Sequence, residues 1–158
     1  MVRIRQAQED DAAAVTALWT EAYAGRGPGG RSTPYTDSEF FESLRSGQVH
    51  VAEKGGGVVG VVVLYPPGVA GRTIGGDGEA ELSRLAVSAV ARRAGIGRRL
   101  VQICAAQARA DGAEAIVLWS RPYQSDAHRL YESLGYRRLP ERDSEDADGR
   151  RLVFRCRC

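Results

Sequence analysis

The sequence contains few residues of the kinds that mark several large classes of protein. Its 158 residues include three cysteines and two histidines, no asparagine, and Lys54 as the only lysine. Cys104, Cys156 and Cys158 form neither a disulfide framework nor a CxxC pair, and no histidine stands near Cys156 and Cys158 in the sequence to complete a zinc site. The sequence therefore predicts no metal site and favours a reduced, cytoplasmic protein.

Long hydrophobic runs and strong net charge are also lacking. No segment approaches the roughly 18 apolar residues of a membrane span, and the opening MVRIRQAQEDD lacks the apolar core of a signal peptide. The net charge is +2, so composition does not favour a nucleic-acid partner. We expect a single globular domain over residues 1–158, with neither nucleic acid nor membrane as its main partner.

Alternating and helical patterns predict the order of the elements. The first third reads as strand, helix, irregular loop and helix: Val2–Arg5, a helix through Val15–Ala22 that Asp10 or Asp11 caps, the Gly/Pro-rich loop Ala24–Tyr35, and a helix after the capping box Thr36–Glu39. The remainder reads as strands at 49–53, 58–65, 79–87, 116–119, 136–139 and 151–158, helices up to Ala110 and over 127–134, and loops at 66–78 and 141–148. Strand, helix and strand between 79 and 119 imply a parallel crossover, so we predict an α/β fold with a mixed sheet.

The stretch RRAGIGRRL, residues 92–99 and Leu100, places four arginines and two glycines where a helix begins. Positive charge opposes the dipole at a helix start unless an anion binds there. Glycines allow a ligand to approach the backbone, the first-turn amides are free to bind phosphate oxygens, and arginine forks add charge-assisted bonds. The residues that carry this prediction are Arg92, Arg93, Gly95, Gly97, Arg98 and Arg99.

Two common nucleotide motifs do not fit this stretch. A phosphate-binding loop of the Walker type needs Lys and Ser or Thr after its second glycine, where Arg98 and Arg99 stand. A dinucleotide fingerprint needs a third glycine, where Leu100 stands.

The preceding strand, EAELSRLAV, does not alternate cleanly, because Glu81 and Ser83 share a face with Leu85 and Val87. A β-bulge resolves that mismatch and leaves backbone groups free to bind an extended, amide-bearing ligand like a further strand. A phosphate site beside such a strand matches the chemistry of coenzyme A.

These segments resemble the GCN5-related N-acetyltransferases, the GNAT superfamily. The family's Q/R-x-x-G-x-G/A motif is matched at Arg92, Gly95 and Gly97, its preceding strand at Leu82–Val87, and its later helix by LYESLGY at 130–136. The resemblance covers essentially the whole chain. It implies a single-domain α/β fold with a mixed, mostly antiparallel sheet, a parallel crossover, splayed central strands and about four flanking helices.

The resemblance also implies a binding site for acetyl-CoA as cosubstrate. Backbone groups of Leu85–Val87 would hold the pantetheine arm, residues 92–98 the pyrophosphate, and Ala127 and Tyr131 the far wall. Gln124 stands where family members often have asparagine, so that contact departs from the family pattern. The implied cofactor-binding residues are Leu85, Ala86, Val87, Arg92, Arg93, Ala94, Gly95, Ile96, Gly97, Arg98, Gln124, Ala127 and Tyr131.

Acetyl transfer to an amine needs a polarised thioester and a stabilised thiolate leaving group. The resemblance implies that Tyr131 is the general acid that protonates the leaving sulfur. It also implies a glutamate as the general base, with Glu81 as the first candidate and Glu79 as the second. His50 and His128 receive no chemical role, and Trp119 and Tyr123 are expected to pack the core and the cleft wall.

We therefore predict an N-acetyltransferase that acts on a primary amine of a small molecule or peptide by direct attack in a ternary complex. A non-catalytic acyl-CoA sensor and a protein N-acetyltransferase remain as alternatives. The loops Ala24–Tyr35 and Pro66–Gly78 are expected to bind the acceptor, and the resemblance makes a homodimer a reasonable expectation.

Overall fold

The sheet at the centre of the protein consists of two antiparallel parts joined by a short parallel pair. The structure is a computed structural model that describes residues 1–24, 31 and 33–158. Within these residues the strand order is β1-β2-β3-β4-β5-β8-β6, with β7 paired to β8. The strands are β1 (Val2–Gln6), β2 (Gln48–Lys54), β3 (Gly57–Tyr65), β4 (Glu79–Val87), β5 (Ala115–Ser120), β6 (Arg137–Arg138), β7 (Ser144–Asp146) and β8 (Gly149–Arg157).

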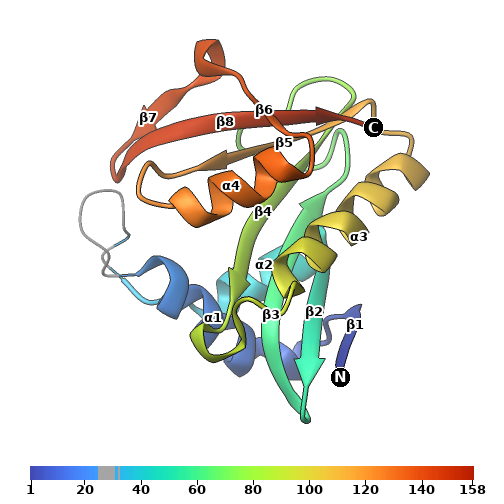
Figure 1. Ribbon diagram of the computed structural model, residues 1–158, viewed down its shortest axis with the longest axis vertical. Helices are drawn as coiled ribbons and strands as arrows, with labels where there is room; N and C mark the ends of the chain where they lie inside the picture. Colours follow the sequence, from blue (N-terminus) through green and yellow to red (C-terminus); the bar gives the residue numbers. More distant parts are fainter. Residues whose placement is uncertain (25–30, 32) are drawn as a thin grey trace.

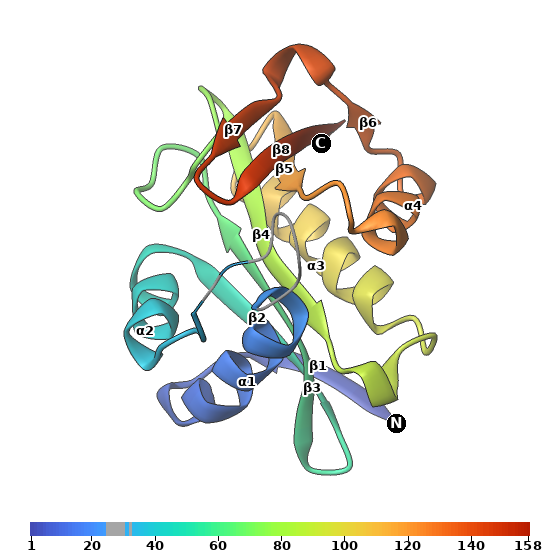
Figure 2. The ribbon, with the colours of Figure 1, turned by 90° about the vertical axis from the view of Figure 1, so that its left-hand side faces the viewer.

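Helices cover both faces of this sheet. α1 (Ala12–Tyr23) and α2 (Asp37–Ser46) lie on one face, and α3 (Ile96–Ala110) and α4 (Ser125–Ser133) lie on the other (Figures 1 and 2). Each pair packs on its own hydrophobic cluster, one containing Trp19 and Phe40 and the other containing Leu100, Cys104 and Tyr131. The predicted α/β fold with a mixed sheet is confirmed.

The antiparallel strands β2 and β3 form a hairpin that turns at the triple glycine Gly55–Gly57. Gly55 and Gly56 have φ values of +59° and +81°. Two consecutive residues with positive φ form the type I′ turn that suits the twist of a hairpin, and glycine adopts this conformation without a steric cost.

The parallel pair is the feature that positions the site. β4 and β5 are connected through α3, and their register in the described chain runs from Glu79 opposite Ala115 to Glu81 opposite Val117. Beyond Glu81 and Val117 the two strands separate, so an opening forms between their carboxyl-terminal parts. The splayed central strands expected from the family resemblance are present.

Three local expectations differ from the structure. The capping box at Thr36 is present, but the Asp11 carboxylate makes no capping bond to α1, because it accepts hydrogen bonds from Arg5 and from the Gln8 amide. The strand expected over 136–139 is reduced to β6, because the Tyr136 amide instead donates to the Tyr131 carbonyl at the end of α4.

The third difference lies in the segment 141–148, where the sequence predicts a plain loop. This segment contains β7, in which Glu145 lies opposite Arg150. Ser144 and Asp146 likewise lie opposite Arg151 and Gly149, so this short strand extends the sheet beyond β8.

No helix in the described part of the chain is long and apolar enough to cross a membrane.

Candidate active site

A bulge in β4 forms the floor of the site. Between the pairs Val63–Ser83 and Val61–Ala86, β3 advances by two residues and β4 by three. The extra residue is accommodated at Arg84, whose φ of +53° lies in the left-handed region. The bulge predicted from the broken alternation of EAELSRLAV is confirmed.

Two aromatic side chains from α1 hold the carbonyl groups of this bulge. The Trp19 indole Nε1 donates to the Arg84 carbonyl at 2.9 Å, and the Tyr23 hydroxyl donates to the Leu85 carbonyl. Because α1 satisfies these acceptors, the bulge keeps a defined conformation at the point where β4 leaves β5.

The RRAGIGRRL stretch forms the second part of the site. Gly95, at φ +75°, is the residue before α3, and Arg93 at φ +68° is also left-handed. A Cβ on Gly95 would meet no atom within 4 Å, so the backbone there faces open space. The α3 amides therefore begin beside an accessible backbone, as a phosphate site requires.

A cavity of about 720 Å³ extends from the β4 bulge to this helix start. It collects most of the residues that the sequence assigns to the cofactor: Leu85, Ala86, Val87, Arg92, Arg93, Gly95, Ile96, Gly97, Arg98, Gln124 and Ala127. Ala94 is not among the described residues that line it, and Tyr131 lines the neighbouring cavity.

The arginines of the stretch divide between two directions. Arg92, Arg93 and Arg98 line the cavity, and Arg98 is oriented by a 2.7 Å hydrogen bond to the Ser133 hydroxyl of α4. Arg99 turns the other way and donates to the Val2 carbonyl of β1 at 3.1 Å. The expectation that Arg99 adds to the anion site is therefore wrong, because its position on α3 directs it to β1.

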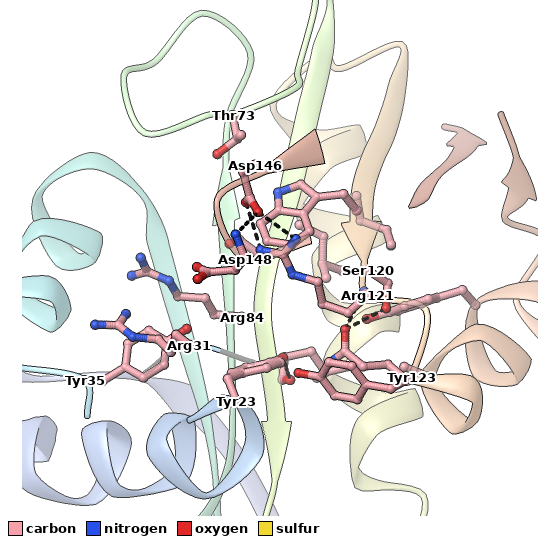
Figure 3. A pocket seen from close by; sticks show the side chains of 18 of the residues that line it. Tyr23, Arg31, Tyr35, Thr73, Arg84, Ser120, Arg121, Tyr123, Asp146 and Asp148 are labelled. Carbon is pink, nitrogen blue, oxygen red and sulfur yellow. Dashed lines mark hydrogen bonds and ion pairs between the residues drawn. The ribbon is translucent and has the colours of Figure 1, made fainter. Parts of the chain in front are cut away.

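A second cavity, of about 450 Å³, lies on the other side of the opening between β4 and β5 (Figure 3). Five residues line both cavities, and they mark the junction between them: Tyr23, Leu85, Tyr123, Gln124 and Ala127. Arg31, Thr33, Tyr35, Gly71 and Thr73 of the two predicted acceptor loops also line the second cavity. Residues 25–30 and 32 of the first loop lie outside the described residues.

Tyr131 lines the second cavity from α4. Its ring packs against Tyr136 and Phe154, and its hydroxyl makes no hydrogen bond to any residue that the structure describes. Burial raises the pKa of the Tyr131 phenol above its usual value of 10. The hydroxyl therefore stays protonated at neutral pH, and its proton is available to a ligand.

A hydrogen-bonded chain fixes the start of α4 next to Tyr131. The Gln124 Oε1 atom accepts from the Arg121 amide at 2.8 Å and from the Ser120 hydroxyl at 2.9 Å. Since Ser120 gives its proton to Gln124, the His128 Nε2 atom, 3.1 Å from the Ser120 oxygen, is the donor in that contact. Burial lowers the pKa of His128, and its ring packs on Phe154, so the histidine has a structural role here.

The two glutamates that the sequence proposes as bases are held by other parts of the fold. Glu81 is 1% exposed, and its carboxylate accepts from the amides of Thr73, Ile74 and Gly75 at 2.8–3.0 Å. This carboxylate therefore anchors the 66–78 loop to β4.

Glu79 is held by Arg142 at 2.9 Å and Arg155 at 2.7 Å. Neither glutamate is among the described residues that line the two cavities. This arrangement gives no support to the prediction that Glu81 or Glu79 removes a proton from the acceptor.

Several residues of the site were missed by the sequence reasoning. Tyr23 lies at the junction of the two cavities, and Arg84 lies on the floor of the acceptor cavity. On the side of β8 this cavity is lined by an ion pair between Arg121 and Asp146, whose Nη2 and Oδ2 atoms are 2.8 Å apart. The sequence could have pointed to Arg84, because this long charged side chain stands at the position where the alternation of β4 is broken. The other contacts join distant segments and had no local signal.

Metal ligands do not gather at the site or elsewhere in the residues that the structure describes: no group of three or more His, Cys, Asp or Glu side chains is placed to hold an ion.

The class of protein follows from a comparison with known families. The chain matches the model of the acetyltransferase (GNAT) family over residues 12–136. The chain belongs to the GNAT family of acetyltransferases.

Individual relatives agree with this assignment. The chain is 36% identical over 92 residues to N-acetyltransferase family 8 member 2 of Rattus norvegicus, a match that covers 58% of this chain and 39% of the relative. The matched part thus spans about two fifths of that relative's length.

Solved structures share the fold at low sequence identity. The ribosomal-protein-alanine N-acetyltransferase of Brucella melitensis has a TM-score of 0.81 at 22% identity, with 99% of each chain covered. The Salmonella typhimurium protein yncA, determined with its cofactor acetyl-CoA, has a TM-score of 0.79 at 20% identity, covering 99% of this chain and 93% of that one. A GCN5-related N-acetyltransferase of Kribbella flavida has a TM-score of 0.76 at 24% identity, covering 99% and 98%.

Proposed function

We propose that the protein transfers an acetyl group from acetyl-CoA to a primary amine of a small molecule or peptide, by direct attack within a ternary complex. The observation that carries this proposal is the junction of two cavities at Leu85, with the free hydroxyl of Tyr131 on the wall of one of them. A donor and an acceptor that enter from opposite sides meet at the β4 bulge.

The larger cavity suits the donor. Its volume of about 720 Å³ and its row of arginines fit a long, phosphate-bearing molecule. In this proposal residues 92–98, with the first amides of α3, hold the pyrophosphate, and Leu85–Val87 hold the pantetheine arm and the acetyl carbonyl. The likeness in fold to the yncA protein, which was determined with its cofactor acetyl-CoA, supports acetyl-CoA as the donor.

The chemistry then requires few groups from the protein. The neutral amine nitrogen attacks the thioester carbonyl carbon, the carbon–sulfur bond breaks, and the amine proton leaves through solvent in the acceptor cavity. Tyr131 donates its hydroxyl proton as a hydrogen bond to the departing thiolate. Because its pKa is raised, the phenol serves the sulfur as a hydrogen-bond donor more readily than by complete proton transfer.

The test is release of free thiol from acetyl-CoA against a panel of small amines and peptide amino termini, with Tyr131→Phe compared to Tyr136→Phe. Tyr136 lies in the same aromatic cluster, and its hydroxyl is buried with no partner among the described residues, so its loss is a matched control. We expect Tyr131→Phe to lower kcat by about 10–100-fold, with the KM values little changed, and Tyr136→Phe to retain activity.

Two outcomes would contradict the proposal. Equal activity of the two variants would remove Tyr131 from the mechanism. Tight binding of acetyl-CoA without turnover on any amine would favour the acyl-CoA sensor.

The remaining expectations about partners belong to this proposal. We propose that the protein needs neither a metal nor a nucleic acid for this reaction and that it acts in the cytoplasm. A homodimer remains a prediction from the family resemblance.

A further inference from the structure

Arg84 occupies a backbone conformation that a long side chain rarely adopts. Its φ of +53° lies in the left-handed region, where steric repulsion disfavours residues other than glycine. Glycine or asparagine would form the same bulge at a lower cost. Strained residues collect at functional sites, and Arg84 lines the acceptor cavity. These two facts indicate that the guanidinium itself has a function there.

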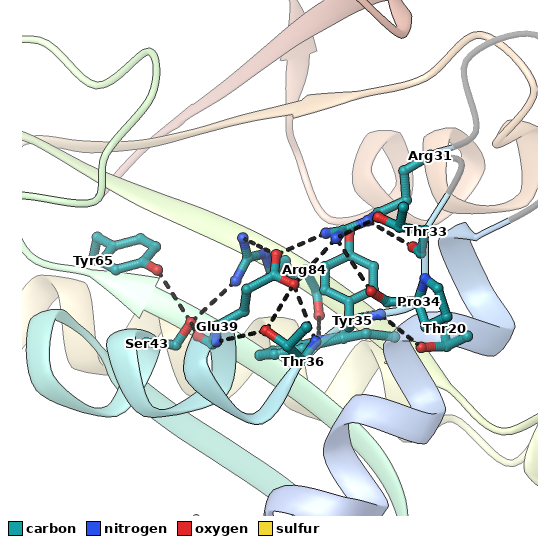
Figure 4. Close-up of polar contacts among 11 residues, drawn as sticks. Thr20, Arg31, Thr33, Pro34, Tyr35, Thr36, Glu39, Ser43, Tyr65 and Arg84 are labelled. Atoms are coloured by element: carbon teal, nitrogen blue, oxygen red, sulfur yellow. Dashed lines mark hydrogen bonds and ion pairs between the residues drawn. The ribbon is translucent and has the colours of Figure 1, made fainter.

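The carboxylate nearest to Arg84 is already neutralised by another arginine (Figure 4). Arg31 binds Glu39 with both of its terminal nitrogens, at 2.7 and 3.1 Å. The Arg84 Nη2 atom lies 3.9 Å from the same carboxylate, and its Nη1 atom donates to the Ser43 hydroxyl at 3.3 Å. Among the described residues, this wall thus has two guanidinium groups for one carboxylate, and Arg84 keeps donors to spare.

Aromatic rings hold the Arg84 guanidinium in place. It lies 5.1 Å from the Trp19 ring centroid and 5.4 Å from that of Tyr35. Its side chain is 30% exposed, so the charge is partly removed from water but open to the cavity. A cation that is fixed and partly desolvated in this way binds an anion more strongly than a mobile surface arginine does.

The opposite wall of the acceptor cavity has no excess of positive charge among the described residues. Asp146 accepts from Arg121 at 2.8 Å and from Arg151 at 3.1 Å, and Asp148 adds a second carboxylate beside it (Figure 3). The charges of these four described residues cancel. Among the described residues of the acceptor cavity, the unbalanced positive charge therefore lies at Arg84.

We propose that the acceptor is a small amino acid-type molecule whose carboxylate binds Arg84. This inference rests on the proposed function, and it adds the substrate class. Arg84 and Leu85 both line the acceptor cavity, and Leu85 also lines the larger cavity. One small molecule can therefore place its carboxylate on Arg84 and its amine at the junction, and a cavity of about 450 Å³ accommodates such a molecule.

The test compares matched acceptors that differ in the carboxylate alone. Free α- and β-amino acids and their carboxamides are assayed for acetylation by the wild type, Arg84→Gln, Arg84→Lys and Arg45→Gln. Arg45 lies on α2 with its side chain 68% exposed and pairs with Glu42, so its variant is the control for loss of one arginine.

We expect the wild type and Arg45→Gln to prefer amino acids over carboxamides by about 10–100-fold in kcat/KM. Arg84→Gln should lose most of that preference, because its kcat/KM falls further for each amino acid than for the matching carboxamide. Arg84→Lys keeps the positive charge but loses the paired N–H donors of the guanidinium, and it should retain part of the preference. A wild type that uses both members of each pair equally overturns the proposal, as does an Arg84→Gln variant that loses both activities in proportion.

A binding measurement separates this inference from the proposed function. Thermal unfolding of the CoA-loaded protein is followed with each amino acid and its carboxamide. If no amine is acetylated, but amino acids stabilise the wild type and not Arg84→Gln, the carboxylate site stands and the proposed function fails. If amino acids and carboxamides give equal shifts in the wild type, the carboxylate site is overturned, whatever the turnover.

Discussion

The indole Nε1 of Trp19 donates a 2.9 Å hydrogen bond to the carbonyl of Arg84, which ties the middle of α1 to the bulge in β4. Trp19 is fully buried, so no water can replace this bond when it is lost. The contact makes the first helix part of the site, although Trp19 itself lines neither cavity among the described residues.

Trp19→Phe tests this role. The variant leaves the Arg84 carbonyl without its donor, and we expect a loss of about 1–3 kcal/mol in unfolding free energy, together with a raised KM for acetyl-CoA because the bulge loosens. Urea unfolding and steady-state kinetics measure the two effects. Phe40→Leu, which changes a neighbouring buried ring that makes no bond to the bulge, is the control and should lower stability without changing that KM. Equal effects on KM in both variants would contradict a specific role for Trp19.

Gly97→Glu tests the anion site. A side chain at this position enters the cavity, where its Cβ would lie 3.3 Å from Leu130, and its carboxylate would oppose the phosphates. We expect the variant to lose the thermal stabilisation by CoA, which amounts to about 2.7 kcal/mol at one hundred times the Kd.

The matched control for this substitution is Gly57→Glu. Gly57 lies at the start of β3, where an added Cβ meets one backbone oxygen at 3.9 Å. It adds the same charge away from the cleft and should leave the CoA shift intact. A shift that persists in Gly97→Glu would place the pyrophosphate elsewhere.

Glu81→Gln distinguishes an anchor from a base. The carboxylate accepts three successive amides of the 66–78 loop, and an uncharged amide oxygen binds them more weakly. We expect a fall of about 1–3 kcal/mol in unfolding free energy and a higher KM for the acceptor, with an unchanged shape of the pH–rate profile. Disappearance of the acidic limb of that profile at unchanged stability would instead make Glu81 the base.

Glu79 gives the protein a predictable dependence on acid. Burial by itself would raise the pKa of Glu79, but hydrogen bonds from Arg142, the Gly76 amide and Arg155 outweigh it and lower the pKa from 4.5 to about 2. A carboxyl whose folded pKa lies below the unfolded value stabilises the fold above pH 4.5, and this contribution is lost as the pH falls towards 2.

The measurement is the melting temperature of the wild type and Glu79→Gln from pH 6 to pH 2.5. We expect the variant to be less stable at pH 6 and the difference to narrow as the pH falls. A difference in melting temperature that stays constant from pH 6 to pH 2.5 would show that the ion pairs of Glu79 with Arg142 and Arg155 do not cause the loss of stability in acid.

Local patterns in the sequence predicted the parts of the site that a short segment determines by itself. The GxG stretch and the broken alternation before Arg84 each reflect a backbone requirement within a few residues. The contacts of Glu79 and Glu81 could not be read in this way, because their partners lie on the 66–78 loop, near residue 142 and on β8. Likewise, Arg99 stands next to Arg98 in sequence, but Arg98 binds Ser133 of α4 and Arg99 binds Val2 of β1, since neighbours on a helix differ by about 100° in direction.

The three residue pairs between β4 and β5 also set how the two parts of the sheet share their stability. The β1–β4 part and the β5–β8 part each have a continuous antiparallel ladder, and few backbone bonds link them. Fluctuations that open one part are therefore expected to reach the other weakly in the absence of ligand. A ligand that lies between β4 and α4 contacts both parts at once, so its binding should slow amide hydrogen exchange on both sides of the cleft together.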